Sequence, residues 1–174
     1  MPHHKKTTRA FAAMALFSRL VPHPNNFTAI LSASVFNSVN FSRRQALVLT
    51  LLGYLLTDCL LAWWQHHPVL GSWSLFSYSG LLMITLLAKK TPPNRPPFTV
   101  LCVLGYSFAF WCWTNFGCFL TMPEYALNWH GFVQCYTAAL PFLQNQCAAD
   151  TLSSIVFIYA HQYCLRWQAQ MQLS

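Results

Sequence analysis

The chain has 174 residues, of which 55% are hydrophobic and 7% are charged, and its formal net charge is +7 at pH 7. An ordinary soluble domain has about 25% charged residues, so this composition excludes that class and indicates an integral membrane protein. The basic residues fall in short segments between long apolar runs. We therefore interpret the positive charge as a signal of membrane orientation and expect no nucleic-acid partner.

Apolar runs of about 18 or more residues are typical of transmembrane helices, since about 20 residues cross the hydrocarbon core. Four runs qualify, give or take a few residues at each end, and two shorter ones are marginal in length. In chain order the six predicted spans are 8–21, 27–41, 45–64, 72–88, 98–120 and 148–165. We predict an all-α, six-helix transmembrane domain over 10–167, flanked by a basic cytoplasmic tail (1–9) and a second cytoplasmic tail (168–174).

The basic residues sort to one side of this arrangement. Nine of the ten do so: Lys5, Lys6, Arg9, Arg43, Arg44, Lys89, Lys90, Arg95 and Arg166. The positive-inside rule predicts that this side is the cytoplasm and that both termini lie there. The three acids, Asp58, Glu124 and Asp150, then fall in the opposite half or in the outer loops, with Arg19 as the one basic residue near them.

The first predicted span ends at a turn that contains Pro22 and Pro24, which places Arg19, His23 and Asn25 at the outer surface. These residues either serve a function there or form a plain turn from which Arg19 reaches the lipid headgroups. The second predicted span, 27–41, is unusually polar. It should therefore face the bundle interior or a cavity rather than lipid.

The third predicted span contains an ionisable residue, Asp58. Such a side chain costs about 2.5–3.5 kcal/mol at the centre of a span, and less toward the end, where Asp58 lies. Asp58 still needs a partner, and Arg19 is the only basic residue on its side. The two side chains either pair and join the first and third helices, or contact a ligand.

The stretch 114–146, between the last two predicted spans, concentrates polar side chains, and Pro141 is expected to interrupt any helix within it. Polar groups at the mouth of an apolar bundle are what a solute-binding pocket needs. Together with the outer turn and Asp58, this region supplies the candidate binding residues. They are Arg19, His23, Asn25, Asp58, Asn115, Tyr136, Asn145 and Asp150.

We predict no metal site, with His23 and Cys59 as weak candidates, because the chain lacks ligands at set spacings. Cys135 and Cys147 could form a disulfide, although buried free thiols are the better interpretation. The sequence also lacks a nucleotide-binding loop, a nucleophile elbow and a paired-carboxylate arrangement. We therefore expect no enzymatic activity, and transport could not be energised by this chain alone.

Several motifs resemble an uncharacterised family of small bacterial multi-pass membrane proteins, over about residues 15–160. In order they are Arg19 with Pro22-His23-Pro24-Asn25-Asn26-Phe27, Thr57-Asp58, Thr114-Asn115-Phe116, Gly131, Cys135-Tyr136, Ala139-Leu140-Pro141-Phe142, Asn145 and Asp150. That family is similar to the substrate-binding S components of energy-coupling-factor (ECF) vitamin transporters. S components are six-helix membrane proteins that take up vitamins or trace metals from the outer side.

The resemblance implies a protein of the bacterial inner membrane that binds and imports a vitamin or related micronutrient. It also implies docking on an ECF-type energising module, made of a transmembrane T component and ATPases. The chain departs from the pattern at Met122-Pro123-Glu124-Tyr125, where the family usually has Tyr-Pro, and at Ala149, where it has glycine. S components typically dock on their transmembrane partner through AxxxA motifs in the first helix. The first predicted helix of this chain lacks an exact copy of that motif.

Two alternatives stay open. One is a solitary carrier for a corrinoid, with His23 or Cys59 as the cobalt ligand. The other is a non-transporting structural or assembly protein, in which the same polar groups only hold the bundle together. The residues identify neither the solute nor a cofactor.

Overall fold

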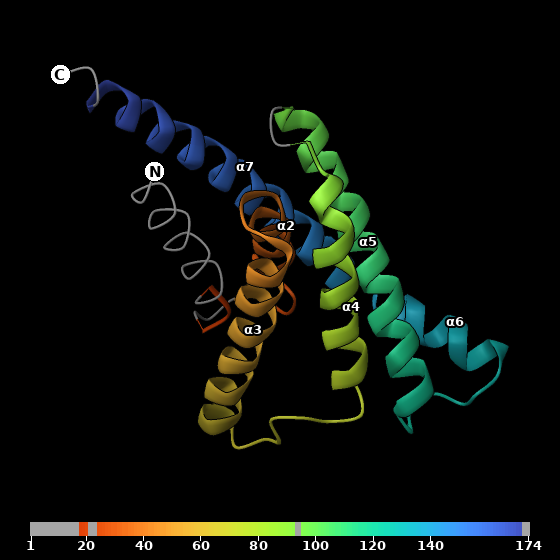
Figure 1. Ribbon diagram of the computed structural model, residues 1–174. Coiled ribbons are helices and arrows are strands. Elements are labelled where there is room, and N and C mark those ends of the chain that lie inside the picture. The colour runs from red at the N-terminus through yellow and green to blue at the C-terminus, as the bar shows by residue number, and fades with distance from the viewer. Residues whose placement is uncertain (1–17, 21–23, 93–94, 172–174) are drawn as a thin grey trace.

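The computed structural model describes residues 18–20, 24–92 and 95–171. Their elements, in order, are the 3₁₀ turn η1 (Ser18–Leu20), α2 (Ile30–Asn40), α3 (Arg43–Gln65), α4 (Ser74–Leu87), η2 (Ala88–Lys90), α5 (Pro96–Thr121), α6 (Trp129–Ala138) and α7 (Leu140–Met171) (Figure 1). No strand occurs in these ranges, so the all-α prediction is confirmed for them. The first predicted span, 8–21, and the tail 1–9 lie almost entirely outside the described residues.

Local sequence signals account for the starts of helices α3 and α5. Ser42 begins α3 with a capping box, in which the Gln45 N–H donates to Ser42 Oγ at 3.4 Å and Ser42 N–H donates to Gln45 Oε1 at 3.3 Å. Pro96 and Pro97 occupy the first turn of α5, where a missing N–H leaves no helical hydrogen bond unmade. Both helices consequently begin slightly before the predicted spans.

The stretch before the last predicted span contains a helix that the sequence analysis did not predict. Helix α6 begins after Asn128, whose Oδ1 accepts a hydrogen bond from Gly131 N–H at 2.9 Å. Helix α7 then begins at Leu140 rather than near 148. Pro141 lies in the first turn of α7, a position that proline tolerates, so it begins a helix instead of interrupting one.

Helix α2 forms the centre of the bundle. Its residues Ile30–Ser38 are all buried, and it packs against α3, α4, α5 and α7. Four buried polar residues lie in this short segment, namely Ser32, Ser34, Asn37 and Ser38. The prediction that 27–41 faces the bundle interior is therefore confirmed. With 11 residues, or roughly 16 Å, the helical part of this predicted span covers about half of a bilayer core of about 30 Å.

Among the described residues, two helices, α3 and α5, are long and apolar enough to cross a membrane. Helix α4 has 14 residues, and α7, with 32 residues, is more polar. These findings support a membrane protein in general terms. The six-span arrangement stays a prediction.

The ends of the helices place five of the described basic residues together. Helices α3 and α5 begin at the end of the bundle where α4 and η2 finish, as Figure 1 shows. This end therefore holds Arg43, Arg44, Lys89, Lys90 and Arg95, all of which are exposed. The opposite end holds the 66–73 and 122–128 connections.

A substitution at Gly131 tests how α6 packs against the preceding loop. A Cβ at Gly131 would overlap the backbone carbonyl oxygen of Ala126, which cannot rotate away as a side chain could. We expect Gly131→Ala to lower the free energy of unfolding in detergent by about 1–3 kcal/mol, a typical cost of overpacking. Gly105→Ala is the control, since nothing lies within 4 Å of a Cβ there. Equal melting temperatures for the two variants would contradict this packing.

Candidate functional site

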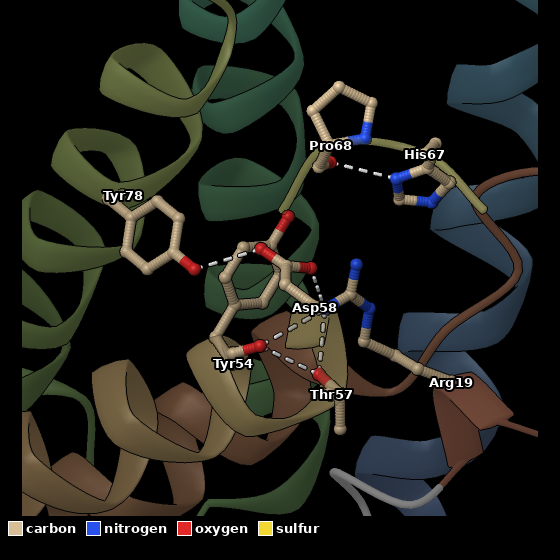
Figure 2. A network of polar contacts seen from close by, with 7 residues as sticks. All are labelled: Arg19, Tyr54, Thr57, Asp58, His67, Pro68 and Tyr78. Carbon is tan, nitrogen blue, oxygen red and sulfur yellow. Dashed lines mark hydrogen bonds and ion pairs between the residues drawn. The ribbon is translucent and has the colours of Figure 1, made fainter. Parts of the chain in front are cut away.

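Arg19 and Asp58 form an ion pair, as one of the two alternatives from the sequence expected. The Arg19 Nη1 and Asp58 Oδ1 atoms are 2.6 Å apart, and the two side chains are 14% and 16% exposed (Figure 2). Arg19 Nη1 also donates to Thr57 Oγ1 at 2.7 Å. The guanidinium carbon lies 4.1 Å from the centre of the Tyr54 ring, within the range of a cation–π contact.

The second Asp58 oxygen has a partner on another helix. Tyr78, from α4, donates its hydroxyl to Asp58 Oδ2 at 2.9 Å, approaching from the side opposite to Arg19 (Figure 2). The Tyr54 and Tyr78 rings meet edge to face with centres 5.1 Å apart. We call these five residues, Arg19, Tyr54, Thr57, Asp58 and Tyr78, the Arg19–Asp58 cluster. It joins η1, α3 and α4.

An open cavity of about 680 Å³ lies between the helices, and η1, the turn after it and all six described α-helices contribute to its wall. Its lining includes Gln65, Trp73, Met122 and Tyr125, which belong to the end opposite to the basic residues. Pockets for small ligands usually have about 300–1,000 Å³ and a mostly apolar lining with a few polar groups. This cavity has the size and the mixed lining of such a pocket.

Four of the eight candidate residues line the cavity: Arg19, Asn25, Asn115 and Asp150. Asn115 donates its Nδ2 to the Trp111 carbonyl of its own helix at 2.8 Å. Its Oδ1 accepts no hydrogen bond from the described residues, so one amide oxygen in the wall is free to bind a solute.

The other candidates are placed beside the cavity or outside the described residues. Asn145 Nδ2 donates to the Asn25 carbonyl at 3.0 Å and fixes the turn after η1 to α7. Tyr136 donates its hydroxyl to the Cys112 carbonyl at 2.7 Å, and burial raises the pKa of this hydroxyl, which stays a neutral donor. Asp58 reaches the cavity only through Arg19. His23 lies outside the described residues.

Asp150 on α7 joins three helices. Its side chain is fully buried, and Oδ1 accepts hydrogen bonds from Ser32 N–H at 3.1 Å and Ser32 Oγ at 2.9 Å. Ser107 Oγ, on α5, lies 2.6 Å from Oδ2. One turn earlier on α7, Gln146 donates its Nε2 to the Ser107 carbonyl at 2.9 Å. We call Ser32, Ser107, Gln146 and Asp150 the Asp150 cluster.

The sequence named His23 and Cys59 as weak candidates for a metal ligand. The described residues contain no group of three or more His, Cys, Asp or Glu side chains that could hold a metal ion. Cys59 is exposed and does not line the cavity. Cys135 and Cys147 are both free thiols, as the sequence analysis favoured.

A family model matches residues 4–172, and its description reads "Family of unknown function" (DUF6580). The chain belongs to DUF6580. This match confirms the expectation of an uncharacterised family. The resemblance to ECF S components stays a prediction. No curated protein and no solved structure matches this DUF6580 protein.

Sequence reasoning missed several site residues of this DUF6580 protein. Gln146 could have been found, because it lies one helical turn before Asp150 and shares its face. Ser107 had no such signal, since it is a single small polar residue in the aromatic-rich fifth span. Tyr54 and Tyr78 were also missed, because their contacts with the ion pair depend on how α3 packs against α4.

A double-mutant cycle tests the Arg19–Asp58 cluster. Asp58→Asn leaves the guanidinium without its ion-pair partner, and Arg19→Gln leaves the carboxylate without one, so each should lower the free energy of unfolding in detergent. The double variant should lose less than the sum, with a coupling energy of about 0.5–3 kcal/mol.

The control for this cycle is Glu124→Gln, because Glu124 is exposed and forms no ion pair within the described part of the chain. It should leave the unfolding free energy unchanged. Strictly additive effects of the Arg19 and Asp58 substitutions would show that the pair contributes nothing as a unit.

Proposed function

We propose that this protein is a multi-pass protein of the bacterial inner membrane that binds a small solute in the 680 Å³ cavity and takes part in its import. The cavity itself is the observation that supports this proposal, because its wall combines aromatic side chains with polar ones, among them the Asn115 amide. The absence of enzymatic activity remains an expectation from the sequence.

The exposed surface of the two long helices supports a membrane location. On α3, Leu52 and Leu56 are 54% and 64% exposed, and on α5, Leu101 and Phe108 are 63% and 54% exposed. Apolar surface of this extent needs a cover, which a lipid bilayer provides. With the basic end in the cytoplasm, the cavity would face the outer side. The six-span topology with both termini inside remains part of the proposal.

The cavity lining favours a polar, vitamin-sized molecule with a planar part. Tyr54, Phe110 and Tyr125 offer aromatic surface, and Asn115 and Gln146 offer amides. Arg19 is neutralised by Asp58, so the wall carries no uncompensated positive charge from the described residues. A corrinoid carrier is the lower-ranked version of the proposal: Cys59 is exposed and does not line the cavity, and His23 lies outside the described residues.

Import against a gradient needs an energy source. An ECF-type module, with a transmembrane T component and ATPases, is the partner that the sequence resemblance implies, and we retain it as part of the proposal. The membrane lipid is the second expected partner, because it would cover the apolar faces of α3 and α5.

A structural or assembly role is the second candidate, and one observation favours it. Most of the predicted polar residues already have protein partners: Arg19 binds Asp58, Asn145 binds the Asn25 backbone, and Tyr136 binds the Cys112 backbone. Such bonds can stabilise a bundle without any ligand. The two candidates differ in whether a solute stabilises the protein.

Thermal unfolding of the purified protein against a panel of vitamins and metal ions separates them. A solute at 100 times its dissociation constant should stabilise the folded state by about 2.7 kcal/mol. Gln146→Leu, which removes an amide from the cavity wall, should weaken or abolish this shift. Gln144→Leu, two residues away on the same helix but exposed, should retain it.

No saturable shift from any compound would favour the structural role. Equal shifts in both glutamine variants would place the binding site elsewhere.

A further inference from the structure

Asp150 is a buried acid surrounded by neutral groups. It is fully buried, and no basic side chain of the described chain contacts it. Helix α2 has no titratable residue, α5 presents the Ser107 hydroxyl to it, and Cys147 is the nearest titratable group on α7. Arg19 lines the same cavity but is paired with Asp58. An ionised carboxylate without a nearby cation is costly in such surroundings.

The hydrogen bonds around Ser107 indicate where a proton would sit. Ser107 Oγ lies 2.6 Å from Asp150 Oδ2 and 3.0 Å from the Val103 carbonyl oxygen. A hydroxyl has one hydrogen and can donate to only one of these acceptors. If Oδ2 carries a proton, it donates to Ser107, and Ser107 donates to Val103. Both contacts are then hydrogen bonds.

The other carboxyl oxygen fits the same assignment. Oδ1 accepts from Ser32 N–H at 3.1 Å, a bond that the carbonyl oxygen of a neutral acid can make. Ser32 Oγ is 2.9 Å from both Oδ1 and the backbone carbonyl oxygen of Asp150, and its one hydrogen can go to either. The Ser32 hydroxyl is in turn 3.0 Å from Ser153 Oγ and 3.1 Å from Ser154 Oγ, both on α7. In the neutral acid, the Oδ2 hydroxyl donates to Ser107 Oγ, and Oδ1 accepts from Ser32 N–H.

We propose that Asp150 is a proton-binding site, occupied at neutral pH, and that its proton is thermodynamically linked to solute binding in the cavity. The link rests on the proposed function, while proton binding itself does not. Asp150 and Gln146 both form part of the cavity wall, and Gln146 also holds the Ser107 backbone. A solute that contacts this wall changes the proton affinity of Asp150, and pH must then change the solute affinity by the same factor.

The composition of the chain permits a direct test by infrared spectroscopy, because it has only three acidic side chains. Asp58 is ion-paired with Arg19 and Glu124 is exposed, so Asp150 is the one acid of the three that is buried among neutral groups. The full-length protein in lipid vesicles should therefore show one C=O stretching band of a protonated carboxylic acid. The band should shift in deuterium oxide and disappear at high pH.

Asp150→Asn should remove this band, while Asp58→Asn and Glu124→Gln should retain it. Asparagine keeps a carbonyl acceptor and offers amide N–H donors in place of the acid O–H, so Asp150→Asn should still fold. If it does not fold, Ser107→Ala serves instead, and should move the band without removing it. A wild-type spectrum with no acid band at pH 7, or a band that Asp150→Asn retains or Ser107→Ala leaves unmoved, would overturn the proposal.

The linkage to solute is measured separately. Once the thermal panel identifies a ligand, its affinity should vary with pH in the wild type and become independent of pH in Asp150→Asn. If the acid band is present but no ligand is found, proton binding stands and the proposed function fails. If a ligand binds with the same pH profile in both proteins, the linkage is refuted.

Discussion

The bundle depends on the hydrogen bonds between Asp150 and the two serines Ser32 and Ser107. Helix α2 has only 11 residues, and nine of them are buried. Its position therefore depends on side-chain contacts with the neighbouring helices. The Asp150 side chain bonds α2 through Ser32 and α5 through Ser107, while its own helix is α7. Three helices thus meet at one carboxyl group, and the apolar core packs around this junction.

The chain has few charged groups, and two of its three acids are used inside the bundle. Asp58 is neutralised by Arg19 and bonded by Tyr78, whereas Asp150 has only hydroxyl and amide neighbours. Arg19 and Asp150 both contribute to the cavity wall, so each cluster reaches the same space. The two clusters therefore combine structural contacts with a polar lining that a solute can use.

Much of this arrangement could be predicted from the sequence. Apolar length located α3 and α5. The charge distribution gave pairing with Arg19 as one of two alternatives for Asp58, because no other cation lay on that side, and the structure shows the pair. Helix α6 was missed, since its polar residues give no clear apolar run and its start depends on the Asn128 cap. The partnership of Asp150 with Ser107 was also missed, because 43 residues separate them and only tertiary packing brings them together.

Native mass spectrometry of the protein purified from bacterial membranes in mild detergent tests most directly whether the cavity holds a solute. The wild type should carry one small molecule per chain. Ala138→Trp, which places an indole in the cavity wall, should carry none while keeping its fold. A wild-type protein without any bound molecule, even after incubation with bacterial extract, or an equal occupancy in both proteins would contradict the account.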